Sequence, residues 1–246
     1  MSQGYENPYS SPVEYGMDPF AAAAAENDRV RFIRNTYLHL AAAVFAFAMI
    51  EMILFAVLPA ATLDQITNLM FGSQLTWLVV LGAFMAVSYI SETWARSSTS
   101  VGTQYAGLSL FVVGQSIIFI PMLHIANTYY PGSILSAAVV TLTIFGGLTA
   151  VVFITKTDFS FLGYGLYILG LAALALIAVS AIGGFQMLGE WFVWAMIVLT
   201  GGYVLYHTSN MMHHYRTDQH VAAALALFSS LAMLFWYILQ LFMSRD

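Results

Sequence analysis

Seven long apolar runs dominate the sequence, and their length restricts the chain to one class of architecture. About 20 apolar residues in a helix cross a hydrocarbon core about 30 Å thick. Because that core offers the backbone no hydrogen-bond partner, such spans are helical. The runs lie approximately at residues 36–59, 75–94, 104–126, 134–155, 161–182, 191–206 and 221–242. The sequence therefore predicts an all-α, polytopic membrane protein whose seven-helix transmembrane domain occupies residues 29–246.

Composition indicates that a lipid bilayer is the main partner of this chain. Hydrophobic residues make up 60% and charged residues 8% of the sequence, whereas soluble domains are about a quarter charged. No basic patch is available to neutralise phosphates, so a nucleic-acid partner is not expected. The first 28 residues are rich in Ser, Pro, Gly, Tyr and acidic groups, and we expect them to form a disordered polar tail.

Lys and Arg predict the orientation of the spans, because positive residues at span ends stay cytoplasmic. Before the first span and after the second, fourth and sixth lie Arg29, Arg31, Arg34, Arg96, Lys156 and Arg216. The opposite loops, at 60–74, 127–133 and 183–190, contain no Lys or Arg. We therefore expect a cytoplasmic N-terminus. Arg245 departs from the pattern and leaves the side of the C-terminus open.

The last apolar run differs from the others because it contains Ser229, Ser230 and Gln240. Polar groups within a span face the bundle interior, since hydrocarbon cannot hydrogen-bond them. We therefore expect this helix to be central, with the other six around it. By the same reasoning Glu51, deep in the first run, is expected to be neutral and hydrogen-bonded.

Polar chemistry is concentrated between the sixth and seventh runs, in residues 203–221 (YVLYHTSNMMHHYRTDQHV). On a continuous helix His207, Asn210 and His214 would share one face. Imidazole titrates near physiological pH, so this face is a candidate pH sensor. For the other two histidines of the segment, hydrogen bonding to headgroups and water explains their presence equally well.

Glu92 and Arg96 are spaced i, i+4 and can form an ion pair on a helix surface. Such a pair contributes only a few tenths of a kcal/mol when solvated, so a structural role and a gating role are equally supported. Adjacent His213 and His214 diverge on a helix and no HExxH spacing occurs, so no metal site is expected. Nucleophile, nucleotide and cofactor motifs are also missing, and cysteine is absent, so we expect neither an enzyme nor a cofactor.

Four stretches of the chain carry a family resemblance. They are Phe32–Leu40 (FIRNTYLHL), Phe145–Gly163 (FGGLTAVVFITKTDFSFLG), Leu205–Tyr215 (LYHTSNMMHHY) and His220–Phe228 (HVAAALALF). In order and spacing they resemble the bacterial branch of the Bax inhibitor-1 family, also called transmembrane BAX inhibitor motif proteins. The resemblance implies a bacterial inner-membrane protein with six helices around a seventh. It further implies a pH-sensitive calcium leak, with Ca2+ as the permeant ion, and a link to a membrane-bound AAA protease.

The resemblance also suggests a gate and a departure from it. In calcium-leak members, an Asp of the sixth helix and an Asp of the seventh share protons and close the pore. Here these places hold His207 and Ser230, while Arg96 matches an Arg that modulates the pair. We expect neutral His207 to hydrogen-bond Ser230 and protonated His207 to repel cations, so conduction is altered or lost. Asp158 and Asp218 are expected near the inner mouth. The alternative is a non-transporting modulator of the protease or of a stress-response complex.

Overall fold

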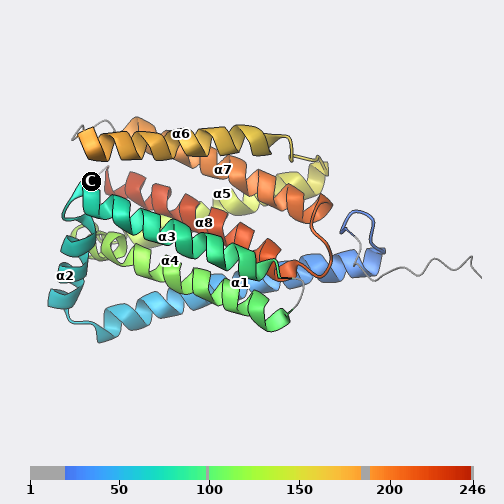
Figure 1. Ribbon diagram of the computed structural model, residues 1–246, viewed down its shortest axis with the longest axis horizontal. Coiled ribbons are helices and arrows are strands. Elements are labelled where there is room, and N and C mark those ends of the chain that lie inside the picture. The colour runs from blue at the N-terminus through green and yellow to red at the C-terminus, as the bar shows by residue number, and fades with distance from the viewer. Residues whose placement is uncertain (1–19, 98–99, 184–188, 245–246) are drawn as a thin grey trace, which may run out of the picture.

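A computed structural model describes residues 20–97, 100–183 and 189–244, and these residues form eight α-helices joined by short connections. The long helices lie side by side in a bundle, and the short α2 lies at one end of it (Figure 1). Their bounds are α1 Glu26–Val57, α2 Ala60–Phe71, α3 Gln74–Ala95, α4 Val101–Tyr129, α5 Ser133–Thr155, α6 Leu162–Gly183, α7 Glu190–His213 and α8 His220–Met243. The predicted all-α membrane class is confirmed.

Seven of these helices coincide with the seven predicted runs, and most bounds differ by only a few residues. The main differences are polar extensions: α1 begins at Glu26 and α7 continues to His213. Glu26 and Asp28 lie in the first turn of α1, where acidic side chains interact favourably with the helix dipole. Apolar length thus locates a helix but misses the turns that continue beyond the hydrocarbon.

Six of the described helices are long and apolar enough to cross a bilayer, and α7 is not among them. Its 24 residues would reach about 36 Å at 1.5 Å per residue. Its second half carries His207, Thr208, Ser209 and Asn210, which reduce its hydropathy. It nevertheless packs along α8 and α6 in the bundle. The count of seven spans therefore stays a prediction that depends on α7.

Helix α2 was not expected, because residues 60–74 were predicted to be a loop. Pro59 precedes its first residue, a position where the missing N–H of proline and its fixed φ are tolerated. Leu63 and Met70, seven residues apart, are buried, and the helix packs against α4 and α3. Twelve residues are too few to span a membrane, so a search for spans passes over such a helix.

Helix α8 lies in the middle of the bundle, as predicted. It packs against α1, α3, α4, α5 and α7, and most of its residues are buried. The expected ring of six is nevertheless incomplete. Helix α6 packs on α7 and α3 instead of making an extensive contact with α8, and α4 is nearly as buried as α8. The core is therefore built around two adjacent helices, α4 and α8.

The positive residues of the described part gather at one end of the bundle, which we call the basic end. The long helices run alternately toward and away from this end (Figure 1). Hydrogen bonds connect its segments: Arg96 after α3 contacts Tyr215 between α7 and α8, and Asp158 after α5 contacts His214. Helix α8 ends at the same end of the bundle as α2, so Ser244 lies at the opposite end from the start of α1.

The expected disordered tail of residues 1–28 is ordered in the part that the structure describes, residues 20–28. The backbone N–H of Ala21 donates to the carbonyl oxygen of Tyr215 at 2.9 Å, and Phe20 forms an antiparallel bridge with Arg216. Ala21 is fully buried. Residues 1–19 lie outside the described residues. Phe20 and Ala21 thus contact the α7–α8 loop, and helix α1 begins a few residues later at Glu26.

Candidate functional site

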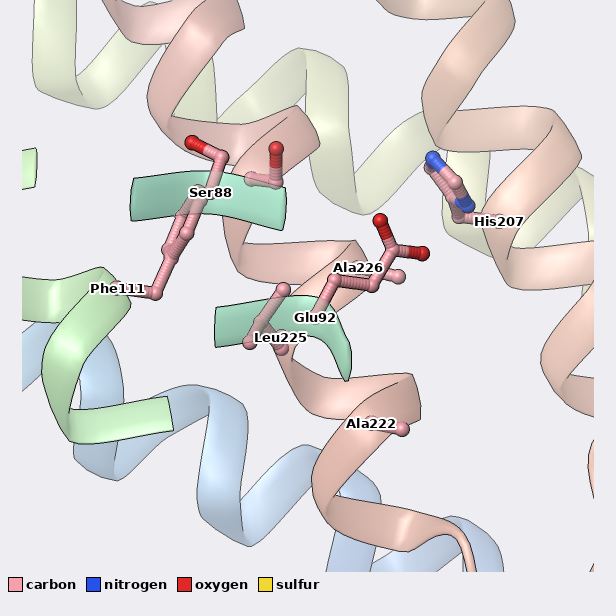
Figure 2. A pocket seen from close by; sticks show the side chains of 8 residues that line it. Ser88, Glu92, Phe111, His207, Ala222, Leu225 and Ala226 are labelled. Atoms are coloured by element: carbon pink, nitrogen blue, oxygen red, sulfur yellow. The ribbon is translucent and has the colours of Figure 1, made fainter. Parts of the chain in front are cut away.

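A small cavity inside the bundle, toward the basic end, brings together two of the predicted gate residues. Its volume is about 100 Å³, enough for a few water molecules. It lies between α3, α4, α7 and α8, and it is lined by Ser88, Glu92, Phe111, His207, Ala222, Leu225, Ala226 and Ser229. Figure 2 shows the Glu92 carboxylate pointing toward the His207 imidazole. We call this space the Glu92–His207 cavity.

Arg96 fixes the position of Glu92 at this cavity. Its Nη2 and Nε donate to Oε1 of Glu92 at 2.8 and 3.2 Å, so the predicted i, i+4 ion pair is present. Nη2 also donates to the Tyr215 hydroxyl oxygen at 3.2 Å. Burial raises the pKa of the Tyr215 hydroxyl, so this group stays neutral as it accepts the bond. The ion pair is thereby tied to the α7–α8 loop, a partner that the sequence spacing did not indicate.

The predicted hydrogen bond between His207 and Ser230 is not present in the described structure. The Ser230 hydroxyl donates to the Ala226 carbonyl oxygen of its own helix at 3.1 Å, and Ser230 is 4% exposed. Ser229, the preceding residue, lines the cavity with His207. Successive side chains on a helix point about 100° apart, so one residue of register decides which serine faces the cavity.

His207 is held by aromatic rings. Its ring lies nearly parallel to that of Tyr203, at 5.9 Å between centroids, and edge-on to Tyr206 at 5.1 Å. The predicted face shared with His214 does not form, because α7 ends at His213. Asn210 contributes its backbone carbonyl, which accepts from the N–H groups of His214 and Tyr215. Of the three residues of the proposed pH-sensing face, the structure places only His207 at the cavity.

Asp158 connects the α5–α6 turn to α7 and to the loop that follows α7, at the basic end. Lys156 ends α5 with φ 52°, a left-handed conformation that reverses the chain. Asp158 Oδ1 then accepts from the Ser160 N–H at 2.9 Å and the Ser209 hydroxyl at 3.2 Å, and Oδ2 lies 3.1 Å from His214 Nε2. The backbone hydrogen bond of Ser160, followed by hydrogen bonds from the Ser160 side chain and from His214, lowers the pKa of Asp158 to about 2.

Asp218, the other inner-mouth candidate, is engaged with a neighbour in its loop. Its Oδ2 accepts from Arg216 Nη2 at 2.7 Å, and both side chains are largely buried. Its Oδ1 and the Arg216 Nε are buried without a hydrogen-bond partner. Both predicted inner-mouth carboxylates therefore lie at the basic end, where each accepts hydrogen bonds within or between loop segments.

Sequence reasoning missed a contact formed by three distant helices. His39 Nε2 of α1 lies 2.7 Å from the Tyr105 hydroxyl of α4, and its ring is 4.9 Å from that of His220 of α8. The six other residues that line the Glu92–His207 cavity, among them Phe111 and Ser229, were also not singled out as gate residues. No spacing rule links residues on separate helices, so only knowledge of which helices contact each other would have found them.

These features define a polytopic helical membrane protein with a cavity between α3, α4, α7 and α8 at which a carboxylate and an imidazole meet. The chain belongs to the Bax inhibitor-1 family: residues 29–246 match the family described as "Inhibitor of apoptosis-promoting Bax1". It is similar to the Bax inhibitor 1 of Schizosaccharomyces pombe, with 28% identity over 226 residues. That match covers 89% of this chain and 79% of the yeast protein. The predicted family resemblance is therefore confirmed.

Proposed function

We propose that this protein is a pH-sensitive cation leak, with Ca2+ as the permeant ion, and that the Glu92–His207 cavity controls passage. The observation that supports this best is the meeting of the half-exposed Glu92 carboxylate, near the end of α3, and the His207 imidazole at one cavity. Ionisable groups among membrane helices are rare and typically mark ion or proton pathways. Family membership points in the same direction.

The proposed control depends on the charge of His207. When His207 is neutral, Glu92 gives the cavity a negative group that attracts a cation. When His207 is protonated, its positive charge opposes that attraction and repels the cation. Arg96 balances part of the Glu92 charge and keeps the carboxylate in place. Acidification therefore reduces cation passage in this protein.

We also propose that the basic end faces the cytoplasm of a bacterial inner membrane. Six of the seven Lys and Arg residues lie in the described part of the chain, all at this end. Positive residues beside spans are retained on the cytoplasmic side. The N-terminus is then cytoplasmic, and the short α2 and the end of α8 lie on the outer side.

Calcium flux into liposomes tests the proposed function. Purified protein is reconstituted with a calcium-sensitive dye inside, and flux is measured from about pH 3.5 to 8, a range that reaches below the ordinary titration of His because burial of an imidazole disfavours its charged form. We expect flux to fall with acidification, to fall at every pH in Glu92→Gln, and to lose most of its pH dependence in His207→Gln. The exposed Glu190→Gln variant is the matched control. If Ca2+, other cations and protons all fail to pass at any pH, the leak is excluded and a non-transporting modulator of a membrane AAA protease or stress complex becomes the better proposal.

A further inference from the structure

A second, larger cavity lies toward the end of the bundle opposite the basic end. Its volume is about 470 Å³, within the range typical of small-molecule sites. Helices α1, α4, α5 and α8 line it, and none of the gate candidates does. Most of the lining is apolar, including the rings of Phe47, Phe55, Phe228 and Phe235.

Two buried polar groups in this lining have no hydrogen-bond partner. Both carboxyl oxygens of Glu51 are buried and unpartnered, and so is the hydroxyl of Thr141. Glu51 is 6% exposed and Thr141 is 2% exposed. The expected internal hydrogen bond of Glu51 is therefore absent from the described structure. Buried polar groups in folded proteins almost always have a partner, so these two indicate a missing ligand.

The charge of the missing partner follows from the surroundings of Glu51. Every described Lys and Arg lies at the basic end, so none of them neutralises this carboxyl group. On neighbouring helices, His124 of α4 and Asp64 of α2 contact each other at 2.8 Å, so each already has a partner. Neither residue lines the cavity, and His124 packs against the cavity residue Phe55, with 6.4 Å between their ring centroids. A basic group supplied from outside the chain would complete the site, because it takes the proton of the neutral Glu51 carboxyl group and remains as a cation beside the carboxylate.

The cavity is open toward the side of the bundle. Near the basic end α1 and α5 meet through the rings of Tyr37 and Phe153, 6.0 Å apart. Toward Glu51 the cavity lies between α1 and α5, and residues of α8 form its floor. Met52 and Leu142 at its rim are 59% and 56% exposed. In a membrane, such a rim faces lipid, so a ligand that partitions into the bilayer can enter laterally.

We propose that this cavity binds a lipophilic amine, with its ammonium group at Glu51 and Thr141 and its apolar body among the four phenylalanines. An ammonium group has three donors, which match the two carboxyl oxygens and the hydroxyl oxygen left without partners. Aromatic faces add attraction for a cation in an apolar setting. An organic acid would place a second carboxyl group beside Glu51. A neutral alcohol would supply no charge.

The test compares two probes that differ in one group, 6-phenylhexylamine and 6-phenylhexan-1-ol. Binding is measured by isothermal titration calorimetry on the full chain in lipid nanodiscs, with empty nanodiscs subtracted to remove partitioning. We expect saturable binding of the amine and at least about tenfold weaker binding of the alcohol, since only the amine pairs with the carboxylate. Glu51→Gln weakens the amine by about tenfold or more. Glu190→Gln, which removes an exposed carboxylate of α7, leaves it unchanged.

A second variant keeps the test decisive if Glu51→Gln does not fold. Ala138, half-buried on α5, lines the cavity, and Ala138→Phe fills the space without altering Glu51. We expect this variant to lose saturable amine binding while it keeps the thermal unfolding midpoint of the wild type within a few degrees. Equal affinity for amine and alcohol, amine binding that Ala138→Phe leaves intact, or no saturable binding above empty nanodiscs would each overturn the proposal.

Discussion

Arg96 and Tyr215 lie 119 positions apart in the chain, and they are joined by a hydrogen bond of 3.2 Å between Nη2 and the hydroxyl oxygen. The guanidinium carbon also lies 5.4 Å from the centre of the tyrosine ring. The same Arg96 holds Glu92 at 2.8 Å. The Glu92 carboxylate at the Glu92–His207 cavity is thus positioned, through Arg96, by Tyr215 in the loop that leads into α8.

Removing the Tyr215 hydroxyl is expected to loosen this arrangement without unfolding the bundle. Tyr215→Phe keeps the ring under Arg96 and deletes only the hydrogen-bond acceptor, which corresponds to a loss of about 0.5–1.5 kcal/mol. We expect a modest fall in the thermal unfolding midpoint and a changed pH profile of flux, because Glu92 moves more freely. Tyr164→Phe, on the exposed face of α6, is the control. Identical flux profiles in both variants would show that the loop does not position Glu92.

Two double variants, each of which introduces a pair of aspartates, test which serine faces His207. The resemblance favours Ser230, whereas the structure places Ser229 at the cavity. We expect His207→Asp with Ser229→Asp to increase pH-dependent Ca2+ flux, since two facing carboxyl groups share a proton and couple their titration. His207→Asp with Ser230→Asp is expected to lower stability with less gain in flux, because Ser230 is buried and its hydroxyl is bonded to α8. The reverse order of the two double variants would show that α8 is rotated in the conducting state.

Asp158 is expected to make stability depend on acid pH. Its folded pKa of about 2 lies below the ordinary value of 3.8, so its contribution is complete above about pH 4 and is lost as pH falls toward 2. The comparison is the unfolding midpoint of wild type and Asp158→Asn between pH 2 and 6. We expect the difference between them to be largest above pH 4 and to shrink toward pH 2. A difference that stays constant across this range would exclude the charged form as the stabilising species.

Gly107 allows α3 and α4 to approach closely. A Cβ placed there would lie 2.5 Å from the Ser91 carbonyl oxygen and 2.7 Å from the Ala95 amide nitrogen. Because backbone atoms cannot move aside cheaply, Gly107→Ala is expected to destabilise the protein by about 1–3 kcal/mol. It should also reduce flux, because α3 carries Glu92. Gly146→Ala is the matched control, since its Cβ would meet nothing within 4 Å; equal unfolding midpoints would contradict this packing.

The absence of cysteine makes the orientation of the bundle directly testable. Single-cysteine variants Thr157→Cys, Tyr129→Cys and Ser244→Cys report the α5–α6 turn, the end of α4 and the end of α8. With a membrane-impermeant maleimide added outside intact cells, we expect labelling of the second and third variants and protection of the first. Labelling of Ser244→Cys only after lysis would mean that α8 does not cross the membrane.

The sequence alone determined the class of the protein and the position of most helices. Apolar runs of about 20 residues leave the chain few alternatives to membrane-spanning helices, because the bilayer cannot satisfy an exposed backbone. The Lys and Arg pattern grouped Arg96, Lys156 and Arg216 at one end because these residues follow alternate runs. The Glu92–Arg96 pair was also predictable, since i, i+4 residues are neighbours on any helix.

Only the tertiary structure decided which residues of separate helices meet. The choice of Ser229 over Ser230 beside His207 depends on the rotation of α8, and a change of one residue turns a side chain by about 100°. The contact of Arg96 with Tyr215 depends on how the α7–α8 loop packs. The unpartnered carboxyl group of Glu51 depends on the space left between α1 and α5. Hydropathy and local spacing describe one helix at a time, whereas these contacts arise from the packing of several helices against one another.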